Sequence, residues 1–142
     1  MKIKILLVDD EKEFIDTLAE RLKIRKLNVS VAYSGNAALK LVQGYDYDVV
    51  VLDVLMPEMD GIETLKLLKE IAPLTQIIML TGNATVDNAI LGMKNGAYDF
   101  LLKPVETAVL IEKINAAFTI KNDHHKRIAK AKIENIVIRR GW

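Results

Sequence analysis

Five short apolar runs rich in β-branched residues recur along the chain, and they constrain the fold more than any other feature of the sequence. They cover residues 3–8, 28–33, 48–53, 76–80 and 98–102. Segments with helical spacing of apolar residues lie between them, bounded mostly by glycine or proline. Runs that are apolar at nearly every position indicate strands buried on both faces. We therefore expect a doubly wound α/β fold, with a five-stranded parallel sheet and helices on both of its faces.

The composition is that of a single globular domain. The chain has 142 residues and no cysteine, which excludes disulfides, thiolate metal sites and thiol catalysis. The opening segment, MKIKILLVDDEKEF, loses its apolar character at Asp9, too early for an export signal or a membrane span. We expect a cytoplasmic protein with no membrane partner.

Charge divides the chain into two parts. Residues 1–120 carry 13 basic and 17 acidic side chains, whereas residues 121–142 carry 7 basic and 2 acidic ones. We expect one domain over 1–120 and a basic, helical tail over 121–142. The tail has two open interpretations, a dimer or partner contact and a linker to an output domain. Direct nucleic-acid binding is the weaker case, because the segment holds no recognisable module.

Polar residues follow four of the predicted strands. Because functional groups of open α/β sheets gather beyond the carboxyl ends of the strands, we expect these residues to meet at one edge. They are Asp9 and Asp10 after the first strand, Asp53 after the third, Thr81 after the fourth, and Lys103, before Pro104, after the fifth.

Clustered carboxylates repel one another unless they share protons or hold a cation. Oxygen ligands without histidine or cysteine favour a hard ion, and Mg²⁺ suits a few carboxylates together with water and a phosphate oxygen. Asp53 could then be both ligand and nucleophile, since a carboxylate accepts a phosphoryl group as an aspartyl phosphate. Lys103 and the Thr81 hydroxyl would stabilise the phosphoryl oxygens.

Each residue also has a plainer interpretation when it is taken alone. Asp9 and Asp10 could cap the first helix, and Thr81 could be an ordinary turn residue. Lys103 could be a solvated loop lysine and Phe100 a core residue. Taken together these interpretations fail, because all would have to coincide at one sheet edge in the order that one mechanism needs.

Four segments resemble the hallmark motifs of the receiver domain of two-component response regulators. They are LLVDDE, VVVLDVLMPEMDG, IIMLTG and GAYDFLLKP, in order and with typical spacing within about residues 3–120. The resemblance implies the flavodoxin-like strand order 2-1-3-4-5, five flanking helices and a C-terminal helical extension.

By position, the resemblance also implies a role for each residue of the edge. Asp53 would be the phosphoacceptor, with Lys103 and Thr81 as catalytic partners and Thr81 also the switch hydroxyl. Phe100 would be the switch aromatic. Mg²⁺ would be held by Asp9, Asp10, Asp53 and the backbone carbonyl of Leu55, and the Lys103–Pro104 peptide would be cis.

The implied function is a response regulator that a sensor histidine kinase or a phosphotransfer protein phosphorylates. Such a protein is not an enzyme in the usual sense, because it catalyses only its own phosphoryl transfer and dephosphorylation. A homodimer could form through the fourth helix, fifth strand and fifth helix, or through the tail. Two alternatives remain: a Mg²⁺-dependent phosphohydrolase of the haloacid dehalogenase type, and a constitutive interaction module that is never phosphorylated.

Overall fold

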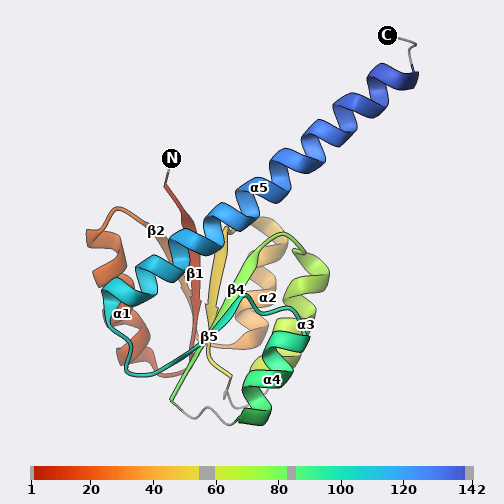
Figure 1. Ribbon diagram of the computed structural model, residues 1–142. Helices are drawn as coiled ribbons and strands as arrows, with labels where there is room; N and C mark the ends of the chain where they lie inside the picture. The colour runs from red at the N-terminus through yellow and green to blue at the C-terminus, as the bar shows by residue number, and fades with distance from the viewer. Residues whose placement is uncertain (1, 55–59, 83–85, 140–142) are drawn as a thin grey trace.

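Five strands alternate with five helices in the computed structural model, which describes residues 2–54, 60–82 and 86–139 (Figure 1). Each strand begins and ends within one residue of its predicted run. The strands are β1 (Lys4–Val8), β2 (Asn28–Ala32), β3 (Val49–Leu52), β4 (Gln76–Thr81) and β5 (Asp99–Leu102). The helices are α1 (Lys12–Ile24), α2 (Gly35–Gly44), α3 (Gly61–Ile71), α4 (Val86–Lys94) and α5 (Thr107–Arg139).

The strands form one parallel sheet in the order β2-β1-β3-β4-β5, which confirms the predicted topology. The strand order reverses between β1 and β3, which pair directly with Val8 opposite Leu52. The crevice beyond such a reversal is where doubly wound folds place their ligands. Asp9 and Asp53, the residues that follow Val8 and Leu52, are therefore neighbours at that crevice.

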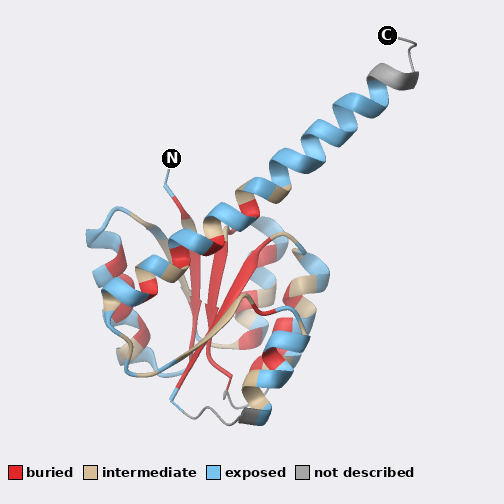
Figure 2. Ribbon diagram, in the orientation of Figure 1, coloured by how far each residue is buried: buried red, intermediate tan, exposed pale blue. Residues whose placement is uncertain are grey.

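Side chains alternate between the two faces of the sheet, and each face has its own core. One face packs Ile5, Leu7 and Ile78 against α1 and α5, and the other packs Leu6, Val50 and Met79 against α2 and α3. Figure 2 shows the central strands β1, β3 and β4 as buried along most of their length, whereas the edge strands β2 and β5 are mostly half-buried and the exposed residues lie on the outer sides of the helices. Burial on both faces explains why the sequence has apolar runs rather than a polar–apolar alternation.

Two helices begin at side-chain caps that the sequence supplies. Ser34 Oγ accepts a hydrogen bond from the Ala37 amide at 3.1 Å at the start of α2. Asp60 Oδ1 accepts one from the Glu63 amide at 2.8 Å at the start of α3. Each cap satisfies an amide that has no partner within its helix.

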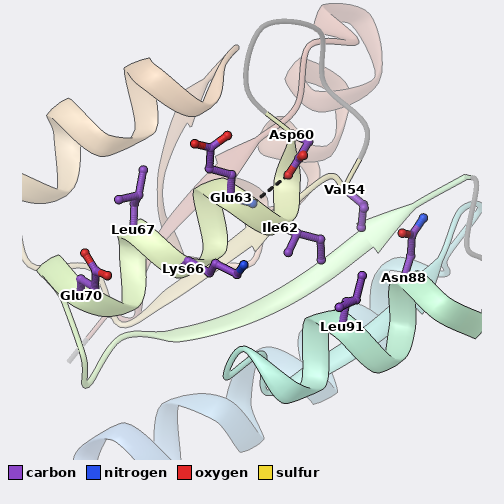
Figure 3. Close-up of a pocket in the computed structure, with 9 residues that line it drawn as sticks. All are labelled: Val54, Asp60, Ile62, Glu63, Lys66, Leu67, Glu70, Asn88 and Leu91. Atoms are coloured by element: carbon purple, nitrogen blue, oxygen red, sulfur yellow. Dashed lines mark hydrogen bonds between the residues drawn. The ribbon is translucent and has the colours of Figure 1, made fainter.

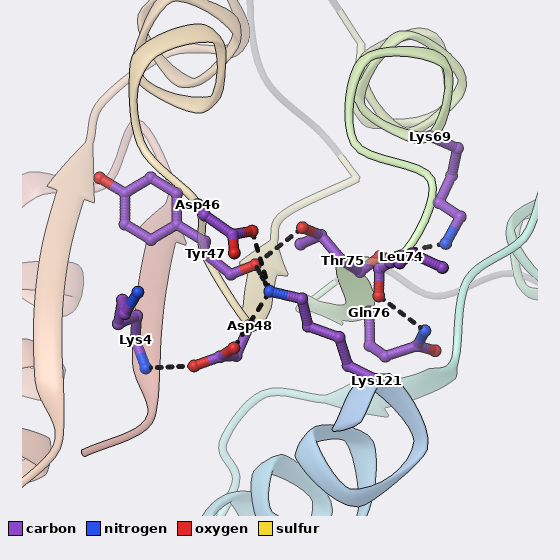
Figure 4. A network of polar contacts seen from close by, with 9 residues as sticks. All are labelled: Lys4, Asp46, Tyr47, Asp48, Lys69, Leu74, Thr75, Gln76 and Lys121. Carbon is purple, nitrogen blue, oxygen red and sulfur yellow. Dashed lines mark hydrogen bonds and ion pairs between the residues drawn. The ribbon is translucent and has the colours of Figure 1, made fainter. Parts of the chain in front are cut away.

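A buried lysine fixes α5 to the amino-terminal edge of the sheet (Figure 4). Lys121 Nζ donates to Asp46 Oδ1 at 2.9 Å, and to Asp48 Oδ1 and the Tyr47 carbonyl at 3.1 Å each. The other oxygen of Asp48 accepts the Lys4 amide at 2.8 Å. Lys121 is only 3% exposed, and its ammonium donates to three acceptors. A buried charge needs such partners, because it has lost its contact with water.

Beyond this anchor α5 continues as one helix to Arg139, so the expected C-terminal helical extension is present. We call residues 122–139 the extension. Figures 1 and 2 show it leaving the body of the protein, with exposed residues along most of its length. In the part of the chain that the structure covers, no helix is both long and apolar enough to cross a membrane.

Candidate functional site

The acidic residues of the site lie where the backbone ladder of the sheet ends. The Asp53 amide donates to the Val8 carbonyl at 3.0 Å, and the Asp9 amide donates to the Ala32 carbonyl at 3.1 Å. Both residues therefore continue the backbone hydrogen bonding of the sheet by one position beyond the strands. Asp53 is 5% exposed and Asp9 is 2% exposed. Asp10, the next residue along, is exposed. Carboxylate oxygens of Asp9, Asp10 and Asp53 all lie within 4.8 Å of one another.

Lys103 reaches this cluster from the end of β5. Its Nζ lies 2.6 Å from Asp9 Oδ2 and 3.4 Å from Asp53 Oδ2. It also lies 3.1 Å from Glu11 Oε1 and 4.3 Å from the centroid of the Phe14 ring. One ammonium thus bridges acids from the ends of two neighbouring strands, and the side chain is only 12% exposed.

Burial and charge act on the two central groups in different ways. Burial raises the pKa of Asp9, and the nearby charge of Asp53 adds to this; the hydrogen bonds from Lys103 and the Glu11 amide only partly offset it. Burial on its own would lower the pKa of Lys103, but the carboxylates of Asp9 and Glu11 outweigh it and hold that pKa above its ordinary value. The lysine is therefore a permanent cation near neutral pH, whereas Asp9 carries an energetic cost for its charge.

These residues fit a hard divalent cation. The Asp9, Asp10 and Asp53 carboxylates lie together, and one ammonium contacts two of them, so the cluster has an excess of negative charge that a cation would neutralise. The donors are all oxygen atoms and lie close enough together to share one ion. Oxygen-only donor sets of this kind suit Mg²⁺ or Ca²⁺ rather than zinc or copper.

The structure places the remaining predicted residues around this cluster. Thr81 is 1% exposed at the end of β4, and its carbonyl accepts the Lys103 amide at 2.9 Å. Phe100 lies half-buried on β5, opposite Met79 in register, and packs against the core on the α2–α3 side. The Lys103–Pro104 peptide is cis. The carbonyl of Leu55, predicted as a metal ligand, lies outside the described residues.

Two residues of the site were not assigned a role from the sequence. Glu11 gives Lys103 a third carboxylate, and the run Asp9-Asp10-Glu11 was the signal that could have revealed it. By helical spacing Phe14 shares the apolar face of α1 with Leu18 and Leu22, yet its ring lies beneath the Lys103 ammonium. A cation over an aromatic face is stabilised by the ring quadrupole, so Phe14 helps to hold the lysine in place.

The protein is a five-stranded doubly wound domain whose acidic pocket lies at the switch point of the sheet, where folds of this class bind their ligands, with a lysine that bridges two of its acids. Comparison with known proteins gives the family. The family described as "Response regulator receiver domain" matches residues 5–115, which is most of the chain. The protein therefore belongs to the response regulator receiver family and to two-component signalling, and its receiver domain is a signalling domain rather than a classical enzyme.

Two transcriptional regulatory proteins are similar to this chain over most of its length. The transcriptional regulatory protein CpxR of Escherichia coli K12 is 42% identical over 113 residues, covering 80% of this chain and 48% of CpxR. The transcriptional regulatory protein ZraR of Salmonella typhimurium is 40% identical over 116 residues, covering 82% of this chain but 26% of ZraR. The chain thus spans between a quarter and a half of the length of these relatives.

Solved structures show the same fold. A CheY-like receiver domain protein from Methanospirillum hungatei superposes with a TM-score of 0.84 at 26% identity, over 87% of this chain and 99% of that one. The match extends over nearly all of that protein, so the two chains share the whole fold of the receiver domain.

Proposed function

We propose that this protein accepts a phosphoryl group at Asp53 from a phosphohistidine of a sensor histidine kinase or a phosphotransfer protein, in a Mg²⁺-dependent reaction. The observation that carries the proposal is the position of the Lys103 ammonium, which contacts Asp9 and Asp53 at once. A cation in that position stabilises negative charge that builds on the oxygens of an arriving phosphoryl group.

In this proposal the three carboxylates bind the metal ion, and one of them, Asp53, is also the nucleophile. Asp9, Asp10 and Asp53 would hold Mg²⁺, which when bound supplies positive charge to the phosphoryl oxygens. An oxygen of Asp53 attacks phosphorus in line, the phosphorus–nitrogen bond breaks, and its electron pair stays on the imidazole nitrogen of the donor. Lys103 then pairs with the new phosphoryl group, and the Thr81 hydroxyl donates a hydrogen bond to one of its oxygens. Attack by water later releases inorganic phosphate and restores the Asp53 carboxylate.

The signal would travel from this edge along β4 and β5. Movement of Thr81 toward the phosphoryl group would leave space for Phe100 to turn inward, and the backbone bond between Thr81 and Lys103 links the two strands at this point. The adjoining surface already exposes apolar side chains, among them Ile90, Met93 and Leu102. Phosphorylation would shift the population between two arrangements of this surface, formed by α4, β5 and α5.

We assign the receiver function to residues 1–120 and treat 121–142 as a separate segment for output or assembly. A homodimer through α4, β5 and α5, or through the tail, is one form that the output could take. The named relatives are transcriptional regulators but are longer than this chain, so any contact with nucleic acid is assigned to a fused or partner output domain.

The family match favours this function over a hydrolase of the haloacid dehalogenase type, whose nucleophile normally lies on the first core strand, whereas Asp53 follows β3. A constitutive interaction module is the alternative that experiment must exclude.

The test is intact-mass spectrometry after incubation with acetyl phosphate and Mg²⁺. We expect one added phosphoryl group that hydroxylamine removes, that chelation of the metal prevents, and that Asp53→Asn abolishes. Asp46→Asn removes a carboxylate at the opposite edge of the sheet and serves as the matched control, with uptake unchanged. Absence of both an adduct and measurable Mg²⁺ binding would overturn the proposal in favour of the constitutive module.

A further inference from the structure

A groove runs between α3 and α4, on the face of the sheet away from α1 and α5 (Figure 3). It has a volume of about 670 Å³. Five residues of α3 line it, four of them spaced as successive turns of one helical face, together with two residues of α4 and two residues that precede α3. The lining consists of Ile62, Glu63, Lys66, Leu67 and Glu70 of α3, Asn88 and Leu91 of α4, and Val54 and Asp60 before α3.

This lining combines the apolar side chains of Val54, Ile62, Leu67 and Leu91 with charged side chains that are mostly acidic. Leu67 and Ile62 are half-buried and Leu91 is 45% exposed, so the groove offers apolar surface to a partner. Three acids, Asp60, Glu63 and Glu70, stand against the single basic residue Lys66. An amphipathic helix with an apolar stripe and basic flanks is the partner that matches such a groove.

The extension has this complementary pattern. Ala129, Ile133 and Ile136 follow a spacing of i, i+4 and i+7 and share one face of α5. All three are exposed, with Ile133 at 62% and Ile136 at 49%. Lys126 and Lys132 are exposed on the two sides of this stripe, as their helical angles require. Ala129 to Ile136 and Glu63 to Glu70 each advance seven positions along a helix, or about 10 Å.

The extension cannot reach the groove of its own molecule. α5 packs on the face of the sheet that it shares with α1, whereas the groove lies on the other face. Because α5 is continuous through Lys121, which is anchored to Asp46 and Asp48, the extension projects away from the body (Figure 1). Pairing of two extensions side by side is opposed by their charge, since residues 121–142 hold 7 basic and 2 acidic side chains.

We propose that the α3–α4 groove binds the extension of a second copy of this chain, with its isoleucine stripe on the apolar base of the groove and its lysines against Glu63 and Glu70. If each copy places its extension in the groove of the other, the result is a closed two-fold dimer with two identical contacts. The contact is favoured by charge, because the tail (residues 121–142) has a net positive charge and the rest of the chain has a net negative charge.

The experiment is sedimentation velocity over a range of concentrations, with full-length protein and variants of opposite charge. The groove variant is Glu63→Lys with Glu70→Lys, and the tail variant is Lys126→Glu with Lys132→Glu. The control is Glu13→Lys with Glu20→Lys, which makes the same charge change with the same spacing at exposed positions of α1, away from the groove.

We expect a wild-type dimer that weakens as salt rises. Each charge-reversed variant should raise the dissociation constant by about tenfold or more, since several exposed ion pairs become repulsions in each dimer. The α1 control should dimerise as the wild type does. An equimolar mixture of the groove and tail variants should restore dimerisation, because each tail then meets a groove of opposite charge.

Three results would overturn the proposal: a wild-type protein that stays monomeric, a groove variant no weaker than the α1 control, or a mixture that fails to associate. Loss of the dimer in the tail variant alone would show that the extension binds elsewhere. Circular dichroism of each variant would show that the fold is retained, so that lost association reports on the contact itself.

Discussion

Replacing Lys121 by methionine should destabilise the domain and loosen its C-terminal helix together. Methionine keeps much of the apolar stem but removes an ammonium that lies 2.9 Å from Asp46 Oδ1 and 3.1 Å from both Asp48 Oδ1 and the Tyr47 carbonyl. The substitution therefore leaves three acceptors in place with their shared donor gone.

The cost of this change can be estimated partner by partner. The Asp46 side chain is 65% exposed, so water replaces the lysine there and the loss is less than about 1 kcal/mol. The Asp48 side chain is 13% exposed, and losing its charge-assisted bond should cost about 1.5–3 kcal/mol. The Tyr47 carbonyl keeps a 2.7 Å hydrogen bond from Thr75 Oγ1 and contributes little. We expect a total loss of about 2–3 kcal/mol in the free energy of unfolding.

Urea unfolding followed by far-ultraviolet circular dichroism measures this loss directly. Asp46→Asn is the matched control and should cost less than about 1 kcal/mol, because that carboxylate is mostly solvated. Amide hydrogen exchange should also speed up across residues 122–136 in Lys121→Met. A loss below about 0.5 kcal/mol in Lys121→Met, or an equal loss in Asp46→Asn, would refute the argument that burial makes this lysine important.

Three further predictions concern the site and its supports. Lys103→Met should slow phosphoryl uptake from acetyl phosphate by at least about tenfold, because the cation between the carboxylates is lost; an unchanged intact-mass time course would contradict this. Gly61→Ala should cost about 1–3 kcal/mol in urea unfolding, since its Cβ would overlap the backbone of Asp53 and the next residue. Gly44→Ala meets nothing within 4 Å and should be neutral or slightly stabilising, so equal losses at the two glycines would count against the steric argument. Ser34→Ala removes the cap of α2 and should cost about 1 kcal/mol, and an unchanged thermal midpoint would show that the cap is dispensable.

Apolar periodicity was enough to predict the architecture, because a sheet buried on both faces makes its strands easy to find. Apolar spacing predicts a fourth helix at α4, with Ile90 and Met93 on its apolar face, but it does not predict the face that α4 buries. Ile90 and Met93, which share a face by spacing, are each 47% exposed, whereas Gly92 lies against the Met79 sulfur. A helix that packs through a glycine leaves no apolar signal at its contact, so periodicity points to the wrong side.

The residues of the acidic pocket could be predicted from the sequence where they directly follow, or end, a strand. Asp9, Asp53 and Thr81 each come directly after or at the end of an apolar run, and the parallel sheet brings them to one edge. Lys121 gave no such signal, because its partners lie 73 to 75 positions away along the chain and it belongs to an ordinary-looking basic segment. Contacts that depend on where a long helix crosses the sheet can be read only from the three-dimensional structure.

The continuity of α5 makes the extension a lever. Its first half packs against α1, β3 and β4, and its last 18 residues beyond Lys121 are free of the body for most of their length. At 1.5 Å per residue those residues reach about 27 Å, so a tilt of about 5° at the packed half would displace the tip by about 2 Å. Small repacking near the sheet is thereby magnified at the far end of the helix, where a partner could detect it.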